Sequence, residues 1–301
     1  MTCRIVAEIS ANHLGSYERA VRLVETAAAV GADCVKFQTF TPEQMVDEDL
    51  VLDIGPWEGR KAIDLYREAH TPREWHKPLF KRASELGLTP FSSVFHPDDV
   101  AFLETLDCPI YKISSFEITD LALIRAAART GKPIVISTGM ASNAEIDRAV
   151  IAAYPAGCRD LTLLKCTSAY PAPESEANLA TMVDLPRGSG VLVDGVRKPT
   201  AYGLSDHTLG IGVAVAAVAL GASMIEKHLT LRRADGGPDA AFSMEPEEFA
   251  QLVTECRRAA AALGTVRYGP TASEHSNVAL RRRSGGKRGT LTKSNGNQIN
   301  Q

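Results

Sequence analysis

Residues 201–228 read AYGLSDHTLGIGVAVAAVALGASMIEKH, and this stretch holds a strand, a helix and a second strand in that order. Apolar and β-branched residues predict the strands at 201–205 and 223–228, and the apolar run between them ends at Gly221, a residue typical of helix C-termini. Strand, helix and parallel strand form the repeating unit of α/β folds. The stretch therefore predicts a parallel sheet covered by helices.

The same unit recurs from the start of the chain. Each candidate strand is followed by a helical pattern or a loop, and the strands fall at 4–9, 34–39, 88–92, 110–114, 133–138, 161–166, 201–205 and 223–228. Eight such units close into a barrel, a fold that typically takes about 250 residues. We predict an α/β protein, a (β/α)8 TIM barrel, with a catalytic domain at 1–268.

Three segments depart from this rhythm. Residues 40–71 form a long loop after the second strand, which is more often functional than idle on the catalytic face of a barrel. Residues 183–200 favour an irregular segment over a clean sixth helix. Residues 269–301 are predicted to be a linker remnant and a short basic, polar tail that is disordered from about 275.

Composition excludes several classes of partner. The net charge of −3 and a pI near 6.2 give no electrostatic case for nucleic acid or a membrane, and the basic tail as a nucleic-acid arm is disfavoured by its lack of aromatic residues. No run reaches the ~18 apolar residues of a membrane span. Six cysteines without a CxxC pair indicate reduced thiols and a cytoplasmic protein.

Polar residues occupy the ends of all eight predicted strands. The active site of an α/β barrel lies at the C-terminal ends of its strands, and buried polar groups are costly unless partnered, so these residues predict one shared wet pocket. In strand order they are Glu8; Lys36 and Gln38; Ser92 and Ser93; Lys112, Ser115 and Glu117; Ser137 and Thr138; Ser168 and Tyr170; Ser205, Asp206 and His207; Glu226 and His228.

Two histidines and two lysines suggest the chemistry of this pocket. His207 and His228 end neighbouring strands and are predicted to hold one divalent metal, Mn, Fe or Zn more readily than Mg. The alternative is that one of them is a general acid or a hydrogen-bonded core residue. Lys36 and Lys112 suit a phosphate or a carboxylate, with a Schiff base as the rival role.

At these residues the chain resembles the sialic acid synthase family over roughly residues 4–274. The motifs that carry the resemblance are AEISANH at 7–13, VKFQTF at 35–40, KISSFE at 112–117, STGM at 137–140, CTSAYP at 166–171, SDHTLG at 205–210, EKH at 226–228 and GPD at 237–239. The resemblance implies a TIM-barrel enzyme that condenses phosphoenolpyruvate with an amino-sugar aldehyde and releases phosphate. It also implies a homodimer.

Within the family, the chain is most similar to the branch that makes pseudaminic acid. The carrying stretches are AIDLYREAHTPREW at 62–75, SSFEITD at 114–120, LLKCTSAYPAP at 163–173 and GGPDAAFSMEP at 236–246. They imply a 2,4-diacetamido-2,4,6-trideoxy hexose of the altrose type as acceptor. The alternatives are an N-acetylneuraminate or legionaminate synthase, distinguished by pocket residues such as Ser168 and Phe242, or a catalytically impaired barrel that binds phosphoenolpyruvate.

The resemblance also implies a role for each residue of the predicted site. The metal, Mn²⁺ with Mg²⁺ or Co²⁺ as alternatives, is held by His207 and His228. Phosphoenolpyruvate is held by Lys36, Ser93, Lys112, Ser115, Ser137 and Thr138. The other substrate-binding residues are Gln38, Ser168, Tyr170, Ser205 and Asp239, and the catalytic residues are Glu8, Glu117, Asp206 and Glu226.

The chain departs from the family pattern at its C-terminal end. Family members usually continue into a small antifreeze-like domain that reaches across the dimer and adds an arginine to the partner's sugar pocket. Residues 269–284 begin toward that linker and are followed by GGKRGTLTKSNGNQINQ. We therefore expect the antifreeze-like domain to be absent, which puts full activity in doubt.

Overall fold

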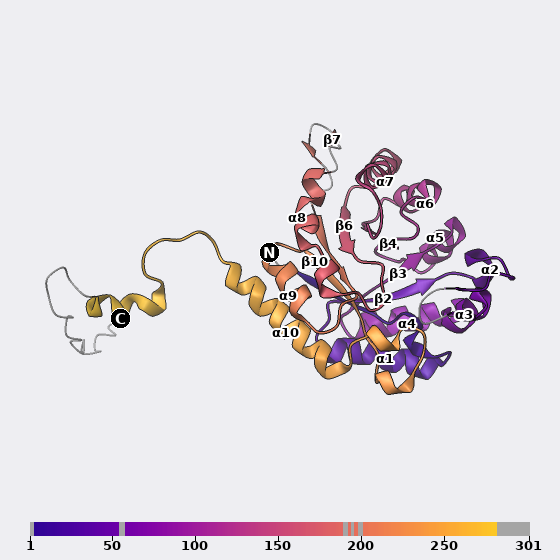
Figure 1. Cartoon of the computed structure of the whole chain (residues 1–301), viewed down its shortest axis with the longest axis horizontal. Coiled ribbons are helices and arrows are strands. Elements are labelled where there is room, and N and C mark those ends of the chain that lie inside the picture. Colours follow the sequence, from indigo (N-terminus) through magenta and orange to yellow (C-terminus); the bar gives the residue numbers. More distant parts are fainter. Residues whose placement is uncertain (1–2, 54–57, 189–191, 194–195, 198–200, 282–301) are drawn as a thin grey trace. The chain divides into compact units, whose positions relative to one another are not determined.

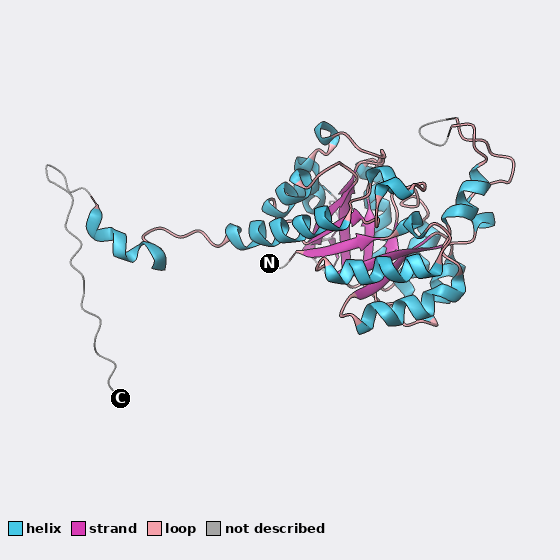
Figure 2. Cartoon of the chain, turned by 90° about the horizontal axis from the view of Figure 1, so that it is seen from below, coloured by secondary structure: helices cyan, strands magenta, loops and turns pink. Residues whose placement is uncertain are grey.

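Eight parallel strands form a closed barrel in the order β1, β10, β9, β6, β5, β4, β3, β2. The computed structural model describes residues 3–53, 58–188, 192–193, 196–197 and 201–281. The strands occupy the centre of Figure 2 and have the bounds Arg4–Glu8 (β1), Cys34–Thr39 (β2), Thr89–Val94 (β3), Tyr111–Ile113 (β4), Ile134–Ser137 (β5), Leu161–Cys166 (β6), Ala201–Asp206 (β9) and Met224–His228 (β10).

Helices surround the barrel on its outside (Figure 1). They are α1 (Tyr17–Ala29), α2 (Pro42–Met45), α3 (Ala62–Ala69), α4 (Arg73–Glu85), α5 (Pro97–Glu104), α6 (Leu121–Arg129), α7 (Asn143–Ala156), α8 (Leu179–Gly188), α9 (Gly212–Ala219) and α10 (Pro246–Leu263). In α1 the Ser16 side chain accepts a hydrogen bond from the Arg19 amide and caps the first turn. Its buried stripe recurs every three or four residues, at Ala20, Leu23, Val24 and Ala27, and packs on the sheet.

The closure of the barrel depends on one small residue in β9. A Cβ atom added to Gly203 would lie 2.2 Å from the carbonyl oxygen of Met224, a backbone atom of β10. No side chain fits at that distance, so the glycine lets the two strands approach. It therefore helps to bring the ends of β9 and β10 into their positions beside each other.

The predicted strands are confirmed, each with ends within two residues of those observed, and so is the TIM barrel. The long loop predicted at 40–71 contains α2, α3 and an isolated bridge between Val51 and Lys61. The prediction of an irregular segment at 183–200 is wrong at its start, because α8 runs from Leu179 to Gly188 and buries Met182 and Leu185. Residues 192–193 (β7) and 196–197 (β8) pair antiparallel, and the rest of 189–200 lies outside the described residues.

The chain divides into two compact units, Met1–Leu263 and Gly264–Gln301. The second unit contains a 3-10 helix (η6, Ala272–Leu280), so residues 275–280 are ordered helix where the sequence predicted disorder. The rest of that prediction falls on residues 282–301, which lie outside the described residues. None of the helices that the structure describes combines the length and the apolar character needed to cross a bilayer.

Candidate active site

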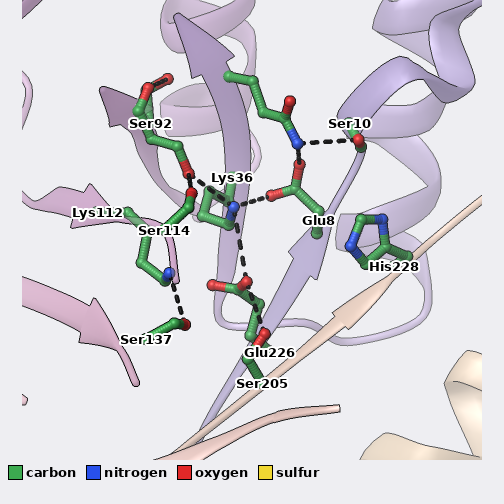
Figure 3. Close-up of polar contacts among 12 residues, drawn as sticks. Glu8, Ser10, Lys36, Ser92, Lys112, Ser114, Ser137, Ser205, Glu226 and His228 are labelled. Atoms are coloured by element: carbon green, nitrogen blue, oxygen red, sulfur yellow. Dashed lines mark hydrogen bonds and ion pairs between the residues drawn. The ribbon is translucent and has the colours of Figure 1, made fainter. Parts of the chain in front are cut away.

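A buried cluster of charged side chains lies where β1, β2 and β10 end (Figure 3). Strand register places Glu8 between Lys36 of β2 and His228 of β10. The Lys36 ammonium lies 2.5 Å from Glu8 Oε2 and 3.6 Å from Glu226 Oε1, and it donates a hydrogen bond of 3.0 Å to Ser93 Oγ. Lys36 therefore has a carboxylate on each side.

The two carboxyl groups of this cluster differ in acidity. Burial raises the pKa of Glu8 to about 7, and the negative charge of Glu226 adds to that rise against the opposing effect of Lys36. Burial also favours the neutral form of Glu226, but the ammonium groups of Lys36 and Lys112 outweigh it and hold the pKa of Glu226 below its usual value. Near neutral pH, Glu226 is therefore the ionised carboxylate beside Lys36, whereas Glu8 is present in both its protonated and its ionised form.

Lys112 is a buried cation with a different environment. Its Nζ donates to Ser137 Oγ at 2.7 Å and to the carbonyl oxygen of Ile113 at 3.0 Å. No carboxylate of the described residues lies within ion-pairing distance of it, and burial, with Lys36 nearby, lowers its pKa. The positive charge of Lys112 is thus available for an anion, and Ser137 supplies an adjacent hydroxyl.

Glu117, in the loop after β4, provides a second carboxyl group that titrates near neutrality. Burial raises its pKa to about 7, although the charge of Lys112 opposes the rise. Its Oε2 atom is buried and has no hydrogen-bond partner among the described residues. An acid with a pKa near the working pH suits general acid–base catalysis.

A hydrogen-bonded group extends the pocket from Glu8 toward Asp239. Gln38 Nε2 donates to Glu8 Oε1 at 3.2 Å and to Ser10 Oγ at 2.9 Å, and the Ser10 hydroxyl contacts the Asp239 carboxylate. Ser10 is not among the site residues predicted from the sequence. Its place inside the AEISANH motif, two residues after Glu8, was the available signal.

The opposite side of the pocket is formed by hydroxyl and aromatic groups. Ser115 Oγ and Ser168 Oγ lie 2.8 Å apart, and a Cβ atom on Gly139 would come within 2.4 Å of Ser115 Cβ, so only glycine fits there. The Tyr170 ring packs against His207 at 4.5 Å between centroids and against Phe242 at 5.1 Å. Phe242 also packs against His228, at 4.9 Å between centroids, so the two aromatic rings contact both histidines.

His207 and His228 lie side by side, with ring centroids 5.5 Å apart. Nδ1 of His207 is 2.9 Å from the carbonyl oxygen of Thr167, which only accepts, so Nδ1 carries the proton and Nε2 keeps its lone pair. Nδ1 of His228 is buried, has no hydrogen-bond partner in the described part of the chain and lies 3.9 Å from Asp239 Oδ2. Burial lowers the pKa of both imidazoles, which keeps them neutral.

These features fit a metal site in part. A neutral histidine whose second nitrogen donates to a carbonyl is the usual form of a metal ligand, and an unpartnered buried nitrogen needs a partner. Within the residues that the structure describes, no group of three or more His, Cys, Asp or Glu side chains is placed to hold an ion. The pair would therefore provide two ligands of such a site.

Three of the polar residues at the strand ends have hydrogen-bond partners outside the charged cluster. Asp206, predicted to be catalytic, has its carboxylate bound by Lys227 at 2.6 Å and by Thr208. Thr138 Oγ1 donates to a backbone carbonyl, at 3.3 Å. Ser92 pairs with Thr39 at 2.7 Å, whereas its neighbour Ser93 faces Lys36. Ser205 does face the pocket, through a bond of 3.1 Å to Glu226.

Comparisons with known proteins agree with this geometry. The NeuB family model matches residues 23–268. A pseudaminic acid synthase from Helicobacter pylori is 42% identical over 265 residues, which are 87% of this chain and 75% of the relative. The chain belongs to the NeuB family.

Two further proteins are similar to this chain over most of its length. A pseudaminic acid synthase from Campylobacter jejuni is 40% identical over 264 residues, covering 86% of this chain and 74% of the relative. The crystal structure of an N-acetylneuraminic acid synthetase from Leptospira borgpetersenii, in complex with citrate, aligns with a TM-score of 0.80 and 32% identity. That alignment covers 92% of this chain and 90% of the other. The family match at residues 23–268 includes seven of the eight barrel strands, from β2 to β10.

Proposed function

We propose that this NeuB family enzyme condenses phosphoenolpyruvate with a 2,4-diacetamido-2,4,6-trideoxy hexose of the altrose type to form pseudaminic acid and phosphate. The observation that carries the choice of sugar is the 40–42% identity to pseudaminic acid synthases, which exceeds the 32% identity to the aligned sialic acid synthetase. As a member of this family, the chain is a transferase that forms a carbon–carbon bond.

The pocket offers groups for both substrates. Lys112, which has no carboxylate partner among the described residues, and the adjacent Ser137 suit the phosphate or carboxylate of phosphoenolpyruvate. Lys36 provides a second cation, whose charge is shared with Glu8 and Glu226. The Ser115, Ser168, Gln38 and Asp239 side chains remain for the polar groups of the sugar, and Tyr170 and Phe242 for its apolar edge.

The reaction joins the enol carbon of phosphoenolpyruvate to the aldehyde carbon of the open-chain sugar. Water adds to the neighbouring carbon, which still carries the phosphate, and the phosphate then leaves as the new hydroxyl group loses its proton to form a ketone. The attacking water must lose a proton and the aldehyde oxygen must gain one. Glu117 and Glu8, with pKa values of about 7, can accept and return protons near neutral pH, and the charged Glu226 can stabilise positive charge that develops at the same carbon.

We also propose that His207 and His228 bind a divalent cation, with Mn²⁺ first and Mg²⁺ or Co²⁺ as alternatives. When bound, the cation would act as a Lewis acid on the sugar aldehyde. Support comes from the neutral, adjacent imidazoles and from Nδ1 of His228, for which the described residues provide no hydrogen-bond partner. A homodimer and a cytoplasmic location remain part of the proposal.

The experiment is phosphate release from phosphoenolpyruvate by the full chain with Mn²⁺, assayed with three sugars in parallel. We expect release with the altrose-type diacetamido trideoxy hexose, and less with the legionaminate precursor or N-acetylmannosamine. Faster release with either of those sugars would reassign the enzyme to that branch. If no sugar gives phosphate release although phosphoenolpyruvate binds measurably, the chain is not an active synthase but a barrel that only binds phosphoenolpyruvate.

A further inference from the structure

The ends of β9 and β10 carry matched pairs of side chains on alternate faces of the sheet. Strand register places Ser205 opposite Glu226 and Asp206 opposite Lys227. Successive side chains of a strand point to opposite faces. Glu226 contacts Ser205 inside the barrel. The Lys227 ammonium lies 2.6 Å from Asp206 Oδ2 on the other face of the sheet. Cys256 of α10 is near this ion pair, because the charges of Asp206 and Lys227 both affect the pKa of its thiol.

The next residue on each strand is one of the two histidines. Asp206 directly precedes His207 and Lys227 directly precedes His228, so the ion pair joins the two strands one residue before both imidazoles. The rings return to the inner face with their centroids 5.5 Å apart. Any change in the spacing of Asp206 and Lys227 would therefore change the spacing of the rings.

The ion pair also fixes the chain beyond His207. Lys227 Nζ donates a second hydrogen bond, of 2.7 Å, to the carbonyl oxygen of Thr208. The other carboxylate oxygen of Asp206 accepts from the Thr208 amide at 3.0 Å and from its hydroxyl at 2.8 Å. Four hydrogen bonds thus hold the residues on both sides of His207, although no bond of this network reaches the imidazole itself.

Stability alone does not account for charges at this depth. Both side chains are 1% exposed, and removing two charges from water costs several kcal/mol per ion. Replacing such a pair by apolar side chains of similar size often leaves a protein equally or more stable. A network that is fully hydrogen-bonded does, however, define one arrangement of the groups that it joins.

We propose that Asp206 and Lys227 are positioning residues that set the distance between His207 and His228 so that both can bind one divalent cation. The inference rests on the metal role proposed above and extends it to two residues that do not touch the pocket. It also gives a function to Asp206, whose carboxylate points away from the reacting groups.

The test compares a variant of the ion pair with a variant of an unrelated one. The double replacement Asp206→Asn with Lys227→Met removes both charges and keeps an oxygen for Thr208. The control, Arg73→Met, breaks the 3.1 Å ion pair between Arg73 of α4 and the buried Asp99 of α5. If the double variant does not fold by circular dichroism, the single Asp206→Asn variant takes its place.

The first readout is the affinity for Mn²⁺ alone, measured by titration calorimetry with the full chain. We expect the double variant to bind Mn²⁺ about tenfold to a hundredfold more weakly, as for other residues that orient metal ligands. Arg73→Met should bind as the wild type does. Metal-free affinity for phosphoenolpyruvate should be the same in all three proteins, since Lys112 and Ser137 are untouched.

The second readout needs no metal. Ring resonances of His207 and His228, followed by NMR in protein labelled with ¹⁵N-histidine, should move in the double variant and stay in place in Arg73→Met. If the ring resonances do not move in the double variant, the inference is wrong, whatever the Mn²⁺ affinity of that variant. It is also wrong if the resonances move but the Mn²⁺ affinity stays the same. If the wild type binds no Mn²⁺, the proposed metal site fails, and the ring resonances alone decide whether the ion pair positions the histidines.

Discussion

At the scale of single residues, Glu117 is the carboxyl group whose environment is best suited to move a proton. Burial raises its pKa to about 7, and one of its oxygens has no partner among the described residues. We expect Glu117→Gln to lower kcat by about 10²- to 10⁴-fold, the usual size of a general acid–base contribution. The measurement is phosphate release from phosphoenolpyruvate as a function of pH.

In the wild type, the profile should have a limb near pH 7, and Glu117→Gln should reduce it to the part that Glu8 contributes. Glu85→Gln, a change at an exposed residue at the end of α4, should leave both rate and profile unaltered. A Glu117→Gln enzyme that keeps its rate would mean that Glu8 alone carries the proton.

His207 gives a second prediction at this scale. His207→Ala removes a proposed ligand and one hydrogen bond to Thr167, so it should cost about 1 kcal/mol of stability while Mn²⁺-dependent turnover falls by about a thousandfold. The matched control is His275→Ala, in the exposed helix η6. Mn²⁺ dependence that survives in the His207→Ala enzyme would show that the imidazole pair has been misassigned.

The sequence located most of the pocket because polar residues stand out at the ends of apolar strands. It did not give the direction of each side chain. Asp206 and Lys227 point away from the pocket because they alternate with Ser205 and Glu226, and this becomes clear once the inward position of Glu226 is known. Ser10 was missed because its role depends on contacts with Gln38 and Asp239, which are distant in the sequence.

At the scale of elements, the contact between β9 and β10 depends on Gly203. A Cβ atom there would overlap the Met224 carbonyl oxygen, and backbone cannot yield as a flexible side chain can. Gly203→Ala should therefore destabilise the protein by about 1–3 kcal/mol, the usual cost of overpacking. Urea unfolding measures the change.

Gly212, at the start of α9, is the control for this prediction. Its added Cβ would meet no atom within 4 Å, so Gly212→Ala should be neutral or slightly stabilising. If Gly203→Ala and Gly212→Ala are equally stable, then β9 and β10 can move apart at little cost in the free energy of unfolding.

The strands were predictable from local sequence, whereas helix α8 was not. Barrel strands are covered on both faces, so each appears in the sequence as a nearly continuous apolar run. The helix α8 buries only Met182 and Leu185 among the side chains described for it, and Pro186 interrupts its helical pattern. Its helical state depends on packing against the neighbouring strands, which local sequence does not show.

At the scale of the whole molecule, buried neutral histidines make stability depend on pH. Burial lowers the pKa of His76 to about 4, against about 6.5 in an unfolded chain. Between those values the unfolded chain binds the extra proton, so His76 lowers the free energy of unfolding as the pH falls from 6.5 to 4. Its hydrogen bond to Thr39, of 2.8 Å, joins it to the barrel.

The quantity to compare is the difference in the free energy of unfolding between the wild type and a His76 variant. The raised pKa values of Glu8 and Glu117 make the free energy of unfolding change with pH in the opposite direction over part of the same range, and the difference cancels this effect. Relative to His76→Gln, the wild type should lose up to about 1.4 kcal/mol per pH unit across that window. Denaturant unfolding at several pH values measures it, with His275→Gln as control. A constant difference would show that His76 is not held neutral by burial.

The carboxylates that flank Lys36 also link substrate binding to the proton concentration of the solution. With Glu8 half-protonated near pH 7, an arriving phosphoenolpyruvate anion makes the pocket more negative and favours the neutral acid. Binding should then draw a fraction of a proton from the buffer. Calorimetric titrations of phosphoenolpyruvate in two buffers with different heats of ionisation should give different binding enthalpies, and Glu8→Gln should remove most of that difference.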